Sequence, residues 1–171
     1  MRFSPGPGFL CLALCVCTAA GATSIVERPL AQRVRQADRV VLAQILDSRT
    51  MTPKGDPRHM VTVTRAVVGE NYQGSGPAQI ELVQLGGRSG LWESHVPGDA
   101  TFVEGETAIL ILRCPDNASA PGRCNLVGLG EGKLQVVGAD VLLRSISRGT
   151  FQRRSLSSVR NEIRQAKKAA R

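Results

Sequence analysis

The sequence predicts a mainly β protein: a small antiparallel barrel of five or more strands, with a short helix before it and another helix after it. Three observations lead to this fold class. Polar and apolar residues alternate in several short runs, most clearly at 59–68. Eighteen glycines and nine prolines punctuate the chain, which favours short, hairpin-like connections between such runs. Apolar residues recur at helical spacing near residue 30 and again near the C-terminal end.

Residues 1–22 predict a secretion signal. Arg2 precedes an apolar run at 9–17, and Ala20-Gly21-Ala22 forms an A-x-A cleavage site. The run is shorter than the roughly 17 residues that a membrane-spanning helix needs. We therefore expect a secreted or periplasmic protein that begins at Thr23 and has no integral membrane segment after cleavage. The expected organisation is a signal peptide at 1–22, a barrel domain at 23–148 and a basic C-terminal helix at 149–171.

Removal of the signal leaves two cysteines, Cys114 and Cys124. In an oxidising compartment an isolated pair is most simply a disulfide. The alternative, a redox pair, favours the tighter C-x-x-C spacing. The enclosed segment 115–123 is rich in turn-forming residues and contains two prolines, so we interpret it as a loop. Asn117 lies there in a glycosylation sequon.

In the first half of the barrel domain the spacing predicts one short helix and three strands. Leu30, Val34 and Ala37 fall on one face of a helix over 29–37, which has Pro29 in its first turn. The strands are expected at 39–48, 59–68 and 79–85, with a Gly/Pro-rich break at 69–77 and an irregular stretch at 86–99.

The second half contains a nearly continuous apolar run at 107–113, which predicts the central strand. We expect either Ile109 with Ile111, or Leu110 with Leu112, to be its most buried pair. Gly130-Glu131-Gly132 is expected to be a hairpin turn. It would join strands at 125–129 and 133–137, and a further strand is expected at 141–146. Ser155 is a good N-cap for the last helix, whose apolar stripe is Leu156, Val159 and Ile163.

Four sequence elements resemble a family of uncharacterised exported bacterial proteins. These elements are Ala37-Asp38-Arg39-Val40-Val41, Leu85-Gly86-Gly87-Arg88, the segment from Phe102 to Leu112, and Gly128-Leu129-Gly130-Glu131-Gly132-Lys133-Leu134. Their order is also similar to the netrin-like module of tissue metalloproteinase inhibitors. That resemblance implies an OB-like barrel of five strands flanked by helices. Those inhibitors chelate the protease zinc through an N-terminal cysteine, whereas the expected terminus here is Thr23-Ser24-Ile25, so inhibition does not follow from the resemblance.

The sequence shows no recognisable catalytic or metal-binding pattern. His59 and His95 have no second ligand at metal-site spacing. Ser89 lacks the G-x-S-x-G context of a nucleophile elbow. We therefore predict a protein that is not an enzyme and that binds no metal and no cofactor.

Positive charge is concentrated at the C-terminal end. Residues 23–143 carry 12 basic and 13 acidic side chains, whereas residues 144–171 carry nine basic side chains and one acidic one, Glu162. Such a cluster is typical either of a solvated helix face or of a surface that binds polyanions. The candidate polyanion-binding residues are Arg160, Arg164, Lys167, Lys168 and Arg171.

The stretch 86–99 is the second candidate binding surface. It contains the only tryptophan of the chain, Trp92, together with Arg88, Glu93 and His95. A Trp92 folded over the barrel mouth is the alternative interpretation. The predicted function is a secreted binding domain of unknown ligand. The alternatives are an inhibitor of secreted metalloproteases and a protein that binds a polyanionic cell-surface polymer.

Overall fold

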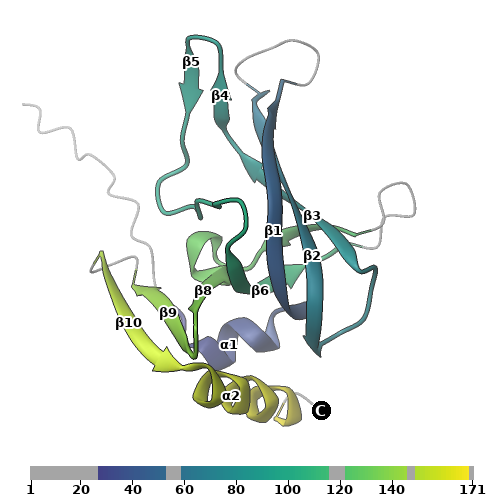
Figure 1. Cartoon of the computed structure of the whole chain (residues 1–171), viewed down its shortest axis with the longest axis vertical. Helices are drawn as coiled ribbons and strands as arrows, with labels where there is room; N and C mark the ends of the chain where they lie inside the picture. The colour runs from purple at the N-terminus through teal and green to yellow at the C-terminus, as the bar shows by residue number, and fades with distance from the viewer. Residues whose placement is uncertain (1–26, 53–58, 116–121, 146–148, 170–171) are drawn as a thin grey trace, which may run out of the picture.

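The computed structural model describes residues 27–52, 59–115, 122–145 and 149–169. The predicted signal peptide, its cleavage site, Asn117 and Arg171 lie outside these residues. The fold is mainly β, as predicted, with one helix near each end of the described chain (Figure 1). No helix of the described part is long and apolar enough to cross a membrane.

The helices are α1 (Leu30–Arg35) and α2 (Leu156–Lys168), and a 3-10 helix, η3, covers Leu129–Gly132. The first five strands are β1 (Arg39–Met51), β2 (Val61–Gln73), β3 (Gln79–Leu85), β4 (Gly87–Ser89) and β5 (Trp92–Ser94). The remaining strands are β6 (Thr107–Arg113), β7 (Arg123–Leu126), β8 (Lys133–Val137), β9 (Asp140–Ser145) and β10 (Thr150–Ser155).

Eight strands form one sheet in the order β1-β2-β3-β7-β6-β8-β9-β10, and β1 also pairs with β6. The five strands β1, β2, β3, β7 and β6 therefore close into a ring. All pairings in the ring are antiparallel except that of β3 with β7, which is parallel at Glu81–Arg123 and Leu82–Cys124. Strands β8, β9 and β10 continue the sheet away from the ring.

Strand β6 is buried on both faces, so the two alternative pairs are equally buried and neither is the most buried one. Ile109, Ile111, Leu110 and Leu112 all have 0% exposure. Ile109 and Ile111 pack in a cluster with the apolar residues of α1 and α2. Leu110 and Leu112 point the other way, into a second cluster made by the strands of the ring. A strand between two cores needs a continuous apolar run rather than an alternating one, and this is what residues 107–113 provide.

Two sequence expectations fail in the first half of the chain. Strand β2 does not stop at residue 68 but continues through Gly69 to Gln73, because its pairing with β1 extends from Met51–Val61 to Val40–Gln73. The stretch 86–99 is not wholly irregular, since β4 and β5 form a short antiparallel hairpin within it.

The expected hairpin around Gly130 is wrong. Strands β7 and β8 do not pair with each other; they pair one after the other along the same side of β6, at Leu112–Leu126 and at Thr107–Val136. The 3-10 helix η3 connects them and lies against the segment before β6. There Gly130 N donates a hydrogen bond to Gly98 O at 2.9 Å. A Cβ atom on Gly130 would lie 2.5 Å from that carbonyl oxygen, so only glycine permits this close approach.

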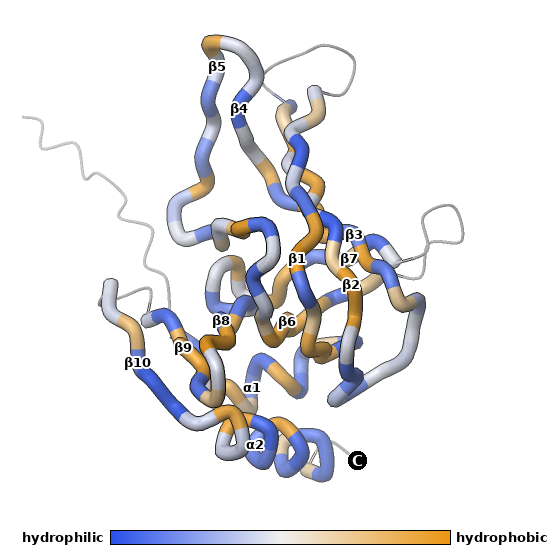
Figure 2. The backbone as a smooth tube through the Cα atoms, viewed as in Figure 1, coloured by the Kyte–Doolittle hydropathy of each residue, from blue (hydrophilic) through white to orange (hydrophobic). Residues whose placement is uncertain are grey.

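The C-terminal helix begins later than the predicted 149–171 segment, because residues 150–155 form β10. The N-cap is confirmed: the Ser155 hydroxyl accepts a hydrogen bond from Ser158 N at 3.2 Å. Along α2, hydrophobic and hydrophilic residues alternate at helical spacing (Figure 2). Val159 and Ile163 are fully buried and Leu156 packs at the edge of the same cluster, so the predicted apolar stripe docks as expected.

Candidate functional site

A pocket of about 290 Å³ lies where the β4–β5 hairpin meets the ends of β1, β2 and β3. Its walls come from three strands of the ring, from the hairpin and from the segment that follows it. They are formed by Ser48, Thr62, Thr64, Gln84, Leu85, Gly86, Gly87, Arg88, Glu93, Ser94, His95, Val96, Asp99, Ala100, Thr101 and Phe102. Three of the four predicted loop residues, Arg88, Glu93 and His95, are therefore brought to one pocket.

The ring strands contribute hydroxyl groups to this pocket. Ser48 Oγ and Thr64 Oγ1 lie 2.7 Å apart, and Thr62 Oγ1 donates to Gly86 O at 3.0 Å. Gly87 passes directly over this region with φ of +139°, and a Cβ atom there would lie 2.6 Å from the Thr62 hydroxyl oxygen. Because glycine has no Cβ atom, Gly87 allows the β4–β5 hairpin to begin in close contact with the threonines of β1 and β2.

The segment 99–102, which forms another wall, is held by a lysine from β8. Lys133 Nζ donates to Thr101 O at 2.6 Å and pairs with Glu106 Oε1 at 2.5 Å. The same ammonium group lies 4.9 Å from the centre of the Phe102 ring. The Lys133–Glu106 pair is nearly buried, so it is screened little by solvent and keeps this wall in place.

The charged residues of the hairpin carry both signs. Arg88 of β4 and Glu93 of β5 are directly opposite each other in the hairpin register, and both are exposed. His95 is exposed just after β5, whereas Asp99 is buried and its Oδ1 accepts from Ala100 N at 2.8 Å. The pocket thus combines neutral hydroxyls, a cation and two carboxylates, which suits a polar ligand group better than a uniformly charged one.

Trp92 does not line the pocket or fold over it. Its side chain is 64% exposed, and the neighbouring Leu91 is fully exposed at the hairpin tip. Figure 2 shows a hydrophobic tip on a hairpin that projects from the rest of the molecule. Trp92 therefore belongs to the same loop as the pocket residues but points to solvent.

The hydroxyl-bearing residues of the pocket and Asp99 do not stand out in the sequence. Ser48, Thr62 and Thr64 lie on two strands and alternate with core residues, a pattern typical of any half-buried strand. Among the described residues, no three His, Cys, Asp or Glu side chains gather as a metal site.

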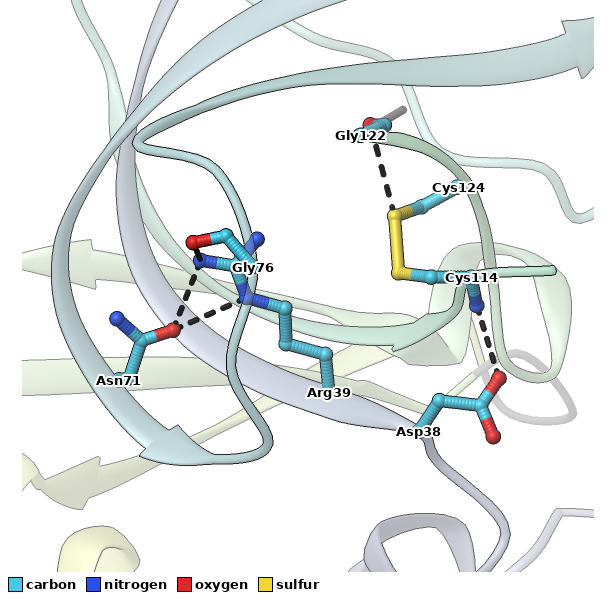
Figure 3. Close-up of a disulfide and its surroundings, with 7 residues drawn as sticks. All are labelled: Asp38, Arg39, Asn71, Gly76, Cys114, Gly122 and Cys124. Atoms are coloured by element: carbon cyan, nitrogen blue, oxygen red, sulfur yellow. Dashed lines mark hydrogen bonds between the residues drawn. A yellow bond between two sulfur atoms is a disulfide. The ribbon is translucent and has the colours of Figure 1, made fainter. Parts of the chain in front are cut away.

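The predicted disulfide pair lies on the ring, between the end of β6 and β7 (Figure 3). The sulfur atoms of Cys114 and Cys124 are at bonding distance, 2.12 Å, and their Cα atoms are 4.2 Å apart. Cys114 N donates to Asp38 Oδ2 at 2.9 Å, which ties the start of β1 to the same place.

Arg39, next to Asp38, is a buried structural residue. It has 3% exposure and its guanidinium donates twice to Asn71 Oδ1, at 3.0 and 2.8 Å (Figure 3). Burial lowers the pKa of Arg39 below its usual value. The Asp38-Arg39 element of the sequence resemblance therefore fastens β1 to its neighbours and takes no part in the pocket.

One candidate polyanion-binding residue of α2, Arg160, is held by contacts within the protein. Arg160 does not face solvent freely; it donates to Tyr72 Oη and to Glu70 Oε2, both at 2.8 Å, and its guanidinium carbon lies 5.6 Å from the centre of the Tyr72 ring. Arg164 and Lys168 are exposed and Lys167 is half-buried. Of the candidate polyanion-binding residues that the structure describes, Arg164, Lys167 and Lys168 therefore stay without the contacts that hold Arg160.

This anchor gives a prediction for Tyr72, the only tyrosine of the chain. Burial raises the pKa of Tyr72, while the hydrogen bond from Arg160 opposes the rise. We expect an absorbance titration of the phenol to have its midpoint above the ordinary value of about 10. Because the folded pKa is raised, the protonated phenol contributes stability below about pH 10 that is lost as the pH rises through the folded value.

Substitution Arg160→Gln should raise the Tyr72 midpoint further, and Arg164→Gln, a matched exposed control, should leave it unchanged. A native midpoint at or below the ordinary value would contradict the buried position of Tyr72.

No protein-family model matches the chain, and no curated protein matches it.

Proposed function

We propose that this chain is an exported, non-enzymatic binding domain that recognises a partner protein through the β4–β5 hairpin and the pocket at its base. The observation that carries the proposal is the exposure of Leu91 and Trp92 side by side at the tip of a projecting hairpin. Burying a large aromatic side chain in a partner's cleft is a common source of binding energy at protein interfaces. The pocket beside the tip offers hydroxyls and opposite charges to polar groups of the same partner.

Export is supported by the signal pattern at 1–22 and by the bonding distance between Cys114 and Cys124. Disulfides persist in oxidising compartments and are rare in the cytosol. The OB-type fold is a further part of the proposal. It is supported by the five-stranded ring, in which β6 lies between β7 and β1, because an OB-fold is a five-stranded Greek-key barrel.

A metalloprotease inhibitor is one form that such a protein-binding domain takes, and it remains the alternative that the netrin-like resemblance suggests. The polyanion alternative depends on α2, where Arg164 and Lys168 stay exposed. We favour the hairpin because it combines an apolar tip with a pocket, whereas charge on an exposed helix face is common on soluble proteins.

The test uses a photo-crosslinking residue at position 91 in the full chain, expressed where it is exported. Partner proteins should crosslink at position 91 and not at Val137, an exposed position on β8. With the identified partner, Trp92→Ala should weaken binding by about 30-fold, the effect of losing a hot-spot side chain. The emission of the only tryptophan should shift to shorter wavelength when that partner is added to the unsubstituted protein.

Val137→Ala is the control, because Val137 is an exposed apolar residue on a different strand and belongs to neither proposed binding surface. Equal affinities of the Trp92→Ala and unsubstituted proteins would refute the hairpin as the binding element. If affinity fell only on changing Arg164 and Lys168, the polyanion alternative would replace it.

A further inference from the structure

Strand β10 is the last strand in the order of the eight-stranded sheet, and among the described strands it pairs only with β9. Each ring strand, in contrast, has a partner on both sides over part of its length. Figure 1 shows the β4–β5 hairpin at the top of the molecule and β10 at the lower left, next to α2. The edge of β10 is therefore distinct from the hairpin tip at Leu91 and Trp92, and the small pocket beside Phe151 adjoins the hairpin pocket through Ala100 and Thr101.

The register identifies which backbone groups point outward. Leu156 N donates to Ala139 O at 2.8 Å, and residues of β10 and β9 pair in step with this bond, from Thr150–Ser145 to Ser155–Asp140. Backbone groups alternate in direction along an antiparallel ladder. Gln152 and Arg154 therefore bond to β9, whereas the N–H and C=O groups of Phe151 and Arg153 face the open edge. No described segment pairs with them.

The side chains beside this edge are an aromatic ring and arginines. Phe151 is 61% exposed and lines a small pocket of about 90 Å³ with Arg144, its neighbour in the register. Arg153 lies on the same face, where its Nη1 forms a solvent-exposed ion pair with Asp140 Oδ2 at 3.7 Å. Arg154 is held by Glu162 at 2.7 Å on the opposite face. The strand contains no acidic residue.

We propose that the open edge of β10 binds an extended acidic segment of a partner protein, which adds to the sheet as a further strand. Unpaired N–H and C=O groups on an exposed edge are a template for such strand addition. The partner is acidic because a carboxylate opposite Arg153 would form a favourable cross-strand pair. A second copy of this chain would bring the same arginines to the edge, and like charges on facing strands repel.

The probe is a capped seven-residue peptide of alternating glutamate and valine, compared with one of alternating lysine and valine. Backbone amide shifts and hydrogen exchange of the full chain report the binding position. We expect the glutamate peptide to protect the N–H groups of Phe151 and Arg153 from exchange in a saturable way. The lysine peptide should bind about 2- to 5-fold more weakly, which is within the range that one cross-strand charge pair supports.

Two substitutions at one position separate backbone pairing from side-chain contact. Phe151→Pro removes an outward N–H, which an edge strand tolerates, and should abolish peptide binding while Gln152 N–H stays protected by β9. Phe151→Thr removes the ring but keeps the N–H, and should retain most of the affinity. Equal loss in both variants would overturn strand addition, because the ring alone would then account for binding.

Arg153→Glu is a second test that does not require Phe151→Pro to fold. It should reverse the preference, so that the lysine peptide binds more tightly than the glutamate peptide. Trp92→Ala should leave peptide binding unchanged, so that this proposal and the hairpin site fail or succeed separately. Shifts confined to Arg164 and Lys168 of α2, or self-association that Phe151→Pro abolishes, would each overturn an acidic strand as the occupant of β10.

Discussion

Replacing Ile163 with alanine is expected to lower the free energy of unfolding by about 2–5 kcal/mol, which is the usual cost of truncating a fully buried isoleucine. Ile163 has 0% exposure and packs in one cluster with Val34 of α1 and Ile109 of β6. The helix that carries it is therefore part of the core, although its composition resembles that of a basic tail. Denaturant unfolding of the purified protein measures the change.

Arg164→Ala is the matched control, one residue further along the same helix and exposed. It should change the free energy of unfolding by no more than about 0.5 kcal/mol, as surface substitutions usually do. If Ile163→Ala were as mild as Arg164→Ala, α2 would not be docked on the sheet.

Removing the disulfide, by the double substitution Cys114→Ala and Cys124→Ala, should cost about 2–3 kcal/mol. The bond closes a loop with a sequence separation of 10, and a loop of this size constrains the unfolded chain by about that amount. It also holds β7, whose parallel pairing with β3 comprises only two residue pairs, Glu81–Arg123 and Leu82–Cys124. Amide exchange should therefore accelerate in β7 and β3 more than in α2.

Reduction of the unsubstituted protein provides the comparison for the double variant, because it breaks the same bond and keeps both side chains. The two should unfold at similar denaturant concentrations, both below the oxidised protein. An oxidised protein no more stable than the reduced one would show that β7 is held by its neighbours without the bond.

Elements whose burial leaves a pattern in their own residues could be predicted from the amino-acid sequence. Strands β3 and β6 begin and end at the predicted residues 79–85 and 107–113, because each apolar run is bounded by turn-forming or charged residues. The start of α2 was also predictable, since Ser155 caps it through its own hydroxyl. The disulfide pair followed from counting the cysteines that remain after residue 22.

Features that depend on partners far away in the chain could be seen only in the folded protein. β10 is mostly exposed and has no apolar alternation, so its pairing with β9 defines it as a strand. The relation of β7 to β8 depends on β6, which pairs with both and leaves η3 between them.

The pocket likewise gathers Thr64, Gln84 and His95 from separate elements. Hydrophobic periodicity indicates which face of a helix or strand is buried. It does not indicate which other segment covers that face. Ring closure, the open edge of β10 and the composition of the pocket are properties of such long-range pairings, and they appear only once the chain is folded.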